Sequence, residues 1–352
     1  MSPTAPGAPT LTRFILEAHR RAPGASGVFS ALLTDVATAI KDIARTVSRG
    51  ALDRPAGGRG AALDAAAHAL LVRHCEWGGH LGGMVSEALE APYAIPSAYP
   101  CGRYLLLFNP LDGSASADVD AAVGTVFSVL RREAGAGPAA AEEFLQPGHR
   151  QVCAGYAIYG PSTVLVLTLG EGVHGFTLDR ELGEFVLTHP DLRIPEPARE
   201  VTVNASHERF WEAPVRRYVE ECRAGHAGPR GADVDLRGVS SLVADVHRLL
   251  VRGGVALHPR DTREPARPGR LRLLCEAAPL ALIVEQAGGA ASTGRARLLD
   301  VTPGALHERV PVFLGSRAEV ERLARYHDEH DRGVDRPFRS PLFGTRSLFI
   351  EP

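Results

Sequence analysis

The sequence lacks any long uninterrupted hydrophobic run, and no window reaches the apolar length that a membrane-spanning helix needs. Its first twelve residues also lack the charged start and apolar middle of a signal peptide. Lys41 is the only lysine, and the arginines form neither a basic stripe nor a polybasic segment. These absences argue against membrane insertion and against binding to nucleic acid or to a membrane surface.

Cysteine is scarce and badly spaced for pairing. The five cysteines are odd in number and scattered, with no CxxC pair: Cys75, Cys101, Cys153, Cys222 and Cys275. Neither a disulfide framework nor a zinc site is therefore indicated. We expect a cytosolic (cytoplasmic) protein.

What is present describes an ordinary globular chain. Its 352 residues are 45% hydrophobic and carry a formal net charge of −2, which is enough chain for two domain-sized units. We expect a disordered Pro/Ala/Gly leader (1–10), an N-terminal domain (11–192), a C-terminal domain (193–330) and a tail (331–352). The domain boundary is placed at the linker-like segment Pro190–Pro197.

Hydrophobic periodicity predicts the secondary structure. The predicted helices are Leu11–Arg20, Val28–Val47, Leu63–Cys75, Ala213–Cys222, Ser240–Leu250, Ala278–Ala287 and Ala318–Tyr326. The predicted strands are Leu81–Val85, Leu105–Phe108, Val123–Leu130, Val152–Tyr159, Thr163–Leu169, Gly175–Asp179, Glu184–Leu187, Val201–Asn204 and Arg272–Cys275. Gly50–Gly60 is predicted to be a loop.

The stretch Tyr104–Arg131 is the most informative part of the chain. Its apolar run Leu105–Phe108 stops at Asn109-Pro110 and passes into the turn Asp112-Gly113-Ser114. A carboxylate beside free backbone N–H groups at a strand end can hold a divalent cation and a phosphate together. An Asp-Gly pair alone is more often an ordinary turn, so the wider context has to decide.

That context resembles the class I fructose-1,6-bisphosphatases. FNPLDGSASAD (Phe108–Asp118) resembles the family signature FDPLDGSSNID, and Ser86-Glu87-Ala88 stands where the family has Ser-Glu-Glu. Three more segments look like family segments in family order, and the tail Pro341–Phe349 resembles proteobacterial members: Gly155–Val173, Val243–Val255 and Gly269–Thr293.

The resemblance implies a layered α/β (α+β) fold of alternating helices and mixed sheets, shared with inositol-monophosphatase-like sugar phosphatases. It also implies Mg²⁺-dependent hydrolysis of the 1-phosphate of fructose 1,6-bisphosphate or a related sugar bisphosphate, with Mn²⁺ as an alternative metal. The chain would form a homotetramer or dimer.

The resemblance assigns site residues as well. The metal ligands would be Glu87, Asn109, the carbonyl of Leu111, Asp112 and Glu276. The catalytic acids would be Asp64 and Glu87, although Asp64 could equally be a helix-start residue that faces the dipole. The substrate contacts would be Asp112, the N–H groups of Gly113, Ser114 and Ala115, and the side chains of Asn204, His207, His258 and Arg270. Arg237 matches an arginine that reaches a neighbouring subunit's site.

The departures from the family pattern lie at positions that would bind the metal or act on the attacking water. Asn109 replaces an aspartate, Ala88 replaces the second Glu of Ser-Glu-Glu, and Gly58 replaces another acid. Because a hard cation loses attraction when a carboxylate becomes an amide, we expect a degenerate metal site and weakened activity. Two other hypotheses remain open: an enzyme retooled for another phosphorylated metabolite, with His207 and His258 in a pocket opened by Gly238, or a non-catalytic sugar-phosphate-binding or regulatory paralogue.

Overall fold

The computed structural model describes residues 7–21, 27–50, 58–133, 137–238, 241–264 and 268–336. Residues 1–6 of the expected leader, residues 337–352 of the tail and residues 51–57 of the predicted loop lie outside the described residues. None of the helices in the described part of the chain is long and apolar enough to cross a bilayer.

The elements follow one another in mixed order. The helices are α1 (Leu11–Arg21), α2 (Gly27–Arg49), α3 (Arg59–Cys75), α4 (Ala213–Ala224), α5 (Leu242–Arg252), α6 (Ala278–Gln286) and α7 (Arg317–Asp331). The first strands are β1 (Leu81–Ser86), β2 (Tyr93–Ala94), β3 (Tyr104–Asp112), β4 (Val123–Arg131), β5 (Cys153–Tyr159), β6 (Thr163–Thr168), β7 (His174–Asp179) and β8 (Glu184–His189). The later strands are β9 (Glu200–Val203), β10 (Asp235–Arg237), β11 (Val255–His258), β12 (Leu271–Arg272), β13 (Ala290–Ser292), β14 (Arg309–Val310) and β15 (Val312–Gly315).

Among the described residues, the strands form two main sheets. The larger has eight strands in the order β2-β1-β3-β4-β5-β6-β7-β8 and is antiparallel except for the β1–β3 pair. The smaller has five strands in the order β10-β9-β11-β15-β13, with β9 parallel to both β10 and β11. Both sheets are therefore mixed, as expected.

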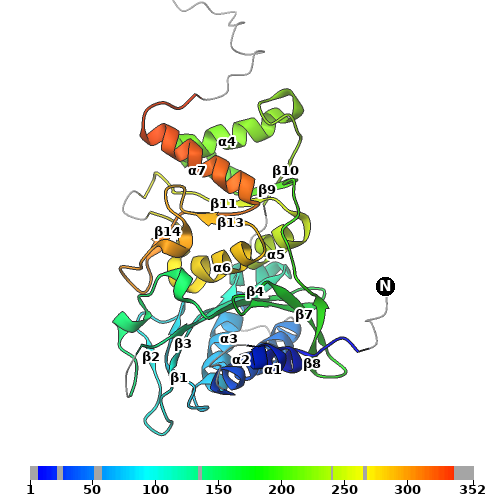
Figure 1. Ribbon diagram of the computed structural model, residues 1–352, viewed down its shortest axis with the longest axis vertical. Coiled ribbons are helices and arrows are strands. Elements are labelled where there is room, and N and C mark those ends of the chain that lie inside the picture. Colours follow the sequence, from blue (N-terminus) through cyan, green and yellow to red (C-terminus); the bar gives the residue numbers. More distant parts are fainter. Residues whose placement is uncertain are drawn as a thin grey trace, which may run out of the picture.

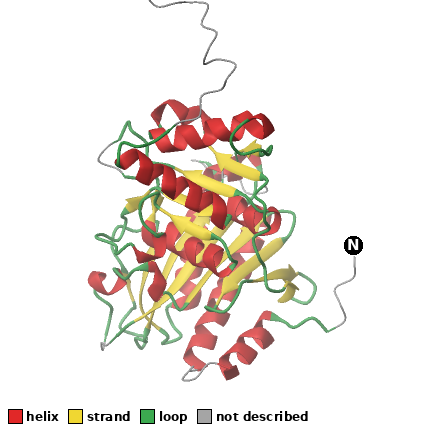
Figure 2. Ribbon diagram, turned by 45° about the horizontal axis from the view of Figure 1, so that its top comes forward, coloured by secondary structure: helices red, strands yellow, loops and turns green. Residues whose placement is uncertain are grey.

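The helices alternate with these sheets in layers. Helices α1–α3 pack on one face of the larger sheet, and α5 and α6 lie between the two sheets (Figure 1). Helices α4 and α7 cover the outer face of the smaller sheet, and the same succession is visible in the tilted view (Figure 2). Each sheet face is apolar and has to be covered, which explains this stacking. The expected architecture is confirmed.

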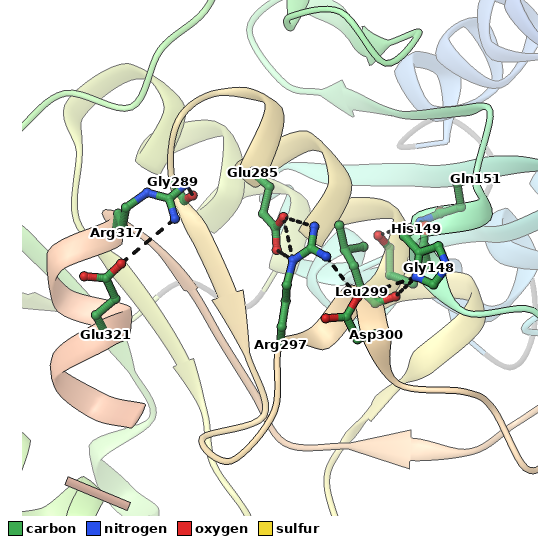
Figure 3. Close-up of polar contacts among 11 residues, drawn as sticks. Gly148, His149, Gln151, Glu285, Gly289, Arg297, Leu299, Asp300, Arg317 and Glu321 are labelled. Carbon is green, nitrogen blue, oxygen red and sulfur yellow. Dashed lines mark hydrogen bonds and ion pairs between the residues drawn. The ribbon is translucent and has the colours of Figure 1, made fainter. Parts of the chain in front are cut away.

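Polar contacts join the first half of the chain to α6 and to the 3₁₀ turn Leu298–Asp300. The side chain of Gln151 donates to the carbonyl of Ala278 (3.0 Å), and His149 Nδ1 lies 3.2 Å from the carbonyl of Leu299. Figure 3 shows His149 beside the segment where Arg297 also pairs with Asp300 (2.9 Å). These contacts hold the central helix layer against the larger sheet.

Among the boundaries that differ from the predictions, those of α3 and β12 have a clear local description. Helix α3 begins at Arg59, inside the predicted loop, because the carboxylate of Asp118 accepts the N–H groups of Arg59 (3.0 Å) and Gly60 (3.3 Å) and so caps the helix from outside it. The predicted strand Arg272–Cys275 ends at Arg272, and a π-helical turn spans Leu273–Ala277. The division of the chain into domains at Pro190–Pro197 stays a prediction.

A buried ion pair fastens α7 to the segment after α4. Glu319, on α7, accepts hydrogen bonds from Arg230 (2.8 Å) and from the hydroxyl of Tyr218 (2.6 Å). Burial raises the pKa of Glu319, but the hydrogen bonds from Arg230 and Tyr218 outweigh it, and the pKa lies below its ordinary value of 4.5. Glu319 therefore stabilises the fold above pH 4.5, and this contribution is lost as the pH falls through the lowered pKa.

Replacing Glu319 by glutamine is expected to lower the free energy of unfolding at pH 7 by about 3–5 kcal/mol, because Arg230 would stay buried without its counter-charge. Glu17→Gln breaks the exposed pair with Arg13 and should cost less than about 1 kcal/mol. Thermal unfolding from pH 3 to pH 7 checks both variants. Equal melting temperatures for Glu319→Gln and the wild type at pH 7 would contradict the assignment.

Candidate functional site

The candidate site begins at the end of β3. Asn109 pairs with Val126 and Asp112 pairs with Gly124, so three steps on β3 face two on β4. Pro110 lies in this bulge, where its missing N–H costs no ladder hydrogen bond. The prediction that the strand stops at Asn109-Pro110 is wrong, because the bulge accommodates the proline and β3 continues to Asp112.

The bulge presents Asp112 to the N-terminus of α5. Its Oδ2 accepts hydrogen bonds from the hydroxyl of Ser241 (2.7 Å) and from the N–H of Val243 (2.9 Å). Gly124 makes this approach possible, since a Cβ there would lie 2.6 Å from Cγ1 of Val243. Burial raises the pKa of Asp112, although the N–H of Val243 and the hydroxyl of Ser241 oppose the change.

Glu276, on the π-helical turn, lies close to Asp112 at the end of β3. One oxygen accepts the N–H of Arg272 (2.7 Å), and the other accepts the amide of Asn109 (3.2 Å). Burial raises the pKa of Glu276, the N–H of Arg272 opposes it, and the charge of Asp112 raises it further. Two buried carboxyl groups that disfavour each other's ionisation thus meet at the end of β3.

Arg272 reaches the other two predicted acids. Its guanidinium pairs with Oε1 of Glu87, the residue that follows β1. Burial raises the pKa of Asp64, while the N–H of Leu111 and the charge of Arg272 oppose this. The structure therefore brings Asp64, Glu87 and Glu276 around one arginine, next to Leu111.

The donor set can be compared with what Mg²⁺ requires. Carboxylate, amide and carbonyl oxygens are its preferred ligands, and a divalent cation would offset the repulsion between Asp112 and Glu276. In the described ranges, however, no three His, Cys, Asp or Glu side chains converge as a metal-binding group. The residues fit the cation in kind, and Glu87 would have to exchange Arg272 for it.

The predicted phosphate-binding turn is a short 3₁₀ helix, Ser114–Val119. It is preceded by Gly113, whose φ of 72° is a left-handed conformation that glycine adopts readily. The carbonyl of Gly113 accepts the N–H of Ser116 (2.7 Å). The N–H groups of Ser114 and Ala115 stand at the start of this helix, where backbone donors have no partner within the helix.

Helix α3 packs closely against this turn. A Cβ on Gly60 would lie 2.3 Å from the carbonyl oxygen of Ser114. Arg59 reinforces the contact, because its guanidinium reaches the carbonyl of Ala117 and pairs with Asp120 (2.8 Å). The helix that carries Asp64 is thus held on the turn predicted to bind phosphate.

Replacing Gly60 by alanine is expected to push α3 away from the turn and to cost about 1–3 kcal/mol of unfolding free energy, as overpacking does. Gly27→Ala is the matched control, because a Cβ on this helical glycine meets nothing within 4 Å. That control should be neutral or slightly stabilising, by up to about 1 kcal/mol. The melting temperatures of the two variants test this prediction. A Gly60→Ala variant that melts at the same temperature as Gly27→Ala would contradict the close packing.

A cavity of about 670 Å³ opens beside Asp112. It lies at the carboxyl ends of the parallel strands β9 and β11, which is a common position for ligand sites in open sheets. Five of the predicted substrate contacts line it, together with Gly238: Asp112, Asn204, His207, His258 and Arg270. Arg260 and Asp245 line it as well.

The two histidines of the cavity differ in setting. His207 Nδ1 lies 3.4 Å from Nη1 of Arg270. Burial lowers the pKa of His258 to about 4, and Arg270 contributes in the same direction. His258 is therefore neutral at pH 7, and its buried Nε2 has no hydrogen-bond partner among the described residues.

Arg237 does not line the cavity, and neither do Gly113, Ser114 and Ala115. Arg237 lies on the edge strand β10, is 45% exposed, and pairs with Asp235 (2.9 Å). Glu200 lies 3.6 Å from the same guanidinium. The expected contact of Arg237 with a neighbouring subunit's site stays a prediction.

Sequence reasoning missed Asp245. It lies on α5 three residues after Leu242 and four before Leu249, so a carboxylate occupies the buried face of an amphipathic helix. Burial raises the pKa of Asp245 to about 7, with a further contribution from the charge of Asp112. A charged residue at an apolar helical position was the signal that could have revealed it.

Comparison with known families covers nearly the whole chain. Residues 9–190 match the family model "Fructose-1-6-bisphosphatase, N-terminal domain", and residues 194–328 match its C-terminal domain. Class 1 fructose-1,6-bisphosphatase of Hydrogenophilus thermoluteolus is 53% identical over 351 residues, covering 97% of each chain. A class 1 enzyme of Methylibium petroleiphilum is 51% identical over 354 residues, covering 98% of each.

Solved structures agree with these matches. The holo form of Leishmania major fructose-1,6-bisphosphatase superposes with a TM-score of 0.84 at 33% identity, covering 92% of this chain and all of that one. Its T-state structure gives the same TM-score at 34% identity, again covering 92% of this chain and all of that one. With both halves of the chain matched and half of its residues shared with relatives of the same length, the chain belongs to the class 1 fructose-1,6-bisphosphatase family.

Proposed function

We propose that this chain hydrolyses the 1-phosphate of fructose 1,6-bisphosphate, or of a related sugar bisphosphate, in a Mg²⁺-dependent reaction. The observation that carries this proposal is Asp112, which joins the acidic cluster with Glu276 to a cavity that holds Arg270 at its wall. A ligand with an anion at one end and a scissile phosphate at the other suits that arrangement. Membership of the family supports the same activity.

The cavity would hold the sugar and its far phosphate. Arg270, with His207 beside it, supplies the cationic contact, and Asn204 adds a neutral polar one. Neutral His258 can hydrogen bond to the substrate without adding charge. The phosphate to be removed would accept the N–H groups of Gly113–Ala115, with Asp112 next to it.

Mg²⁺, or Mn²⁺ in its place, would be held by Glu87, Asn109, the carbonyl of Leu111, Asp112 and Glu276. Such a cation supplies neutralisation of phosphate charge and of the leaving oxygen. Proton transfer from the attacking water falls to Asp64 and Glu87. The raised pKa of Asp64 brings it nearer to neutral pH, which suits a general base.

Three substitutions support a lower activity than an unaltered site would have. The amide of Asn109 donates to Glu276 and so presents a hydrogen, not an oxygen, toward that carboxylate. Ala88 is exposed and brings no acid after Glu87, and Gly58 brings none before α3. We expect weak Mg²⁺ binding as a result.

A homo-oligomer, as a tetramer or dimer, completes the proposal. Arg237 lies exposed at a sheet edge with its guanidinium outside its own cavity. It could therefore contact the substrate of an adjacent copy. Light scattering measures the oligomer, and Arg237→Ala should raise KM without changing kcat if the contact is to bound substrate alone.

Phosphate release from fructose 1,6-bisphosphate, measured against Mg²⁺ and Mn²⁺ concentration, tests the function. Weak but metal-dependent release is expected, with fructose 6-phosphate as the second product. No release at any metal concentration would reject the activity. Faster release from another phosphate ester would instead favour the retooled enzyme.

A further inference from the structure

We propose that Asp245 is a specificity-determining residue whose free carboxylate oxygen accepts a hydrogen bond from a hydroxyl of the sugar. This inference rests on the proposed function in taking a sugar phosphate as the ligand. It concerns a residue on the cavity wall that lies outside the acidic cluster around Arg272.

Asp245 is held in place, but one of its two carboxyl oxygens accepts no hydrogen bond from the described residues. Its residue surface is only 1% exposed, and the side chain of Thr202, on the adjacent strand β9, hydrogen bonds to its carboxyl group. Its Oδ1 has no hydrogen-bond partner among the residues described. A buried carboxylate oxygen left unpaired is costly, and a ligand donor in the cavity would remove that cost.

Among the described residues, no cation forms an ion pair with Asp245. Arg248 lies one turn further along α5, but its guanidinium is paired at 2.7 Å with Glu200. The other charge that influences Asp245 is Asp112, which has the same sign. Asp245 thus lines the cavity and keeps a buried acceptor oxygen that no described protein group satisfies.

The chemistry of the cavity selects a hydroxyl as the donor. A phosphate in the cavity has a cationic partner at Arg270, whereas Asp245 offers it an acceptor and no positively charged donor. An uncharged sugar hydroxyl can donate to a carboxylate, and such charge-assisted bonds are about twice as strong as neutral ones. The ligand is therefore a phosphate ester that carries hydroxyl groups on its carbon skeleton.

Calorimetric binding of two phosphate esters tests the contact without turnover. Fructose 6-phosphate carries the hydroxyls, and n-hexyl phosphate has the same number of carbons and none. Asp245→Ala is expected to weaken fructose 6-phosphate binding about 10- to 100-fold, the range for a hydrogen bond to a charged group, and to leave hexyl phosphate within about 2-fold. Asp245→Asn, which retains an oxygen acceptor, should recover part of the loss.

Asp261→Asn is the matched control, because Asp261 also lines the cavity but its carboxylate is paired with Arg263. It should not change the ratio of the two affinities. Melting temperatures establish that each variant folds, and Asp245→Asn is a near-isosteric test if the alanine variant does not. Equal weakening of both esters, or no weakening of fructose 6-phosphate, would overturn the proposal.

The titrations are made with EDTA and repeated with Mg²⁺. A loss that appears only with Mg²⁺ would show that Asp245 acts through the cation, and the hydroxyl contact would be rejected. Phosphate release is measured on the same wild-type preparation. If no phosphate is released but Asp245→Ala still weakens only fructose 6-phosphate binding, the proposed function is rejected and the contact is supported. If phosphate is released but Asp245→Ala affects both esters equally, the proposed function is supported and the contact is rejected.

Discussion

Replacing Asp112 by asparagine is expected to lower the rate of phosphate release about 1,000-fold, the scale of a lost acid–base or electrostatic group in an active site. The variant is nearly isosteric, and an amide oxygen can still accept from Ser241 and Val243 as Oδ2 does now. The other oxygen becomes an NH₂ group, which cannot bind a cation. The change therefore removes the negative charge and one metal-binding oxygen, while the hydrogen bonds to Ser241 and Val243 and the side-chain volume are kept.

The same variant should be more stable than the wild type at neutral pH. Burial raises the pKa of Asp112 above its ordinary value of 3.8, so the folded chain binds its proton more tightly than the unfolded chain does. Wild-type stability from this group falls as the pH rises above 3.8 through the raised pKa. Melting temperatures from pH 3 to pH 8 should show the gain of Asp112→Asn appearing only at the higher pH values.

Activity that survives Asp112→Asn within about 10-fold of the wild type would reject Asp112 as the centre of the site. Asp261→Asn serves as a control again, since it alters a carboxylate on the cavity rim. It should leave phosphate release within a few-fold of the wild type.

Replacing Asn109 by aspartate is expected to have the second-largest effect, in the opposite direction. The amide of Asn109 now donates to Glu276, and its oxygen accepts the N–H of Leu111 (3.2 Å). An aspartate would add a negative charge beside Glu276 and Asp112, which strengthens the attraction for Mg²⁺. We expect the Mg²⁺ concentration for half-maximal activity to fall about 10-fold or more, on the scale that ligand-shell changes produce.

Without metal, the same aspartate should destabilise the fold, because a third carboxylate joins two that already oppose each other's ionisation. Melting temperatures with EDTA and with Mg²⁺ separate these effects: Asn109→Asp should melt below the wild type with EDTA and gain more from Mg²⁺. Adding Ala88→Glu should raise activity further. A wild type with rapid turnover that neither change improves would refute the expected weakening.

Much of the fold was predictable from local patterns. Helices such as α2 and α5 show their buried faces in their spacing, and the strands β4 and β5 are visible as β-branched or apolar runs. Two misses are local: the bulge at Pro110 hides the length of β3, and Glu276 lies on a π-helical turn that directly follows β12. Neither feature has a distinctive composition.

The candidate site was predictable only in part. Asp112, Asn204, His207, His258 and Arg270 do line one cavity, as their family positions suggested. Asp245 was missed because a single acid in a helix is usually taken as solvent-facing. The role expected of Arg237 at a neighbouring copy stays a prediction, because it depends on a second chain.

The sequence by itself determined the family, the order of its segments and which acids stand at the end of β3, because these depend on residue identity and spacing. Only the tertiary structure decided that Arg272 pairs with Glu87, that Asp112 accepts the N–H of Val243 at the start of α5, and that Asp245 lines the cavity with one oxygen unpartnered among the described residues. These contacts join residues more than a hundred positions apart, or depend on how one helix face is turned. Charge pairing and burial arise from packing, and packing is a property of the folded chain.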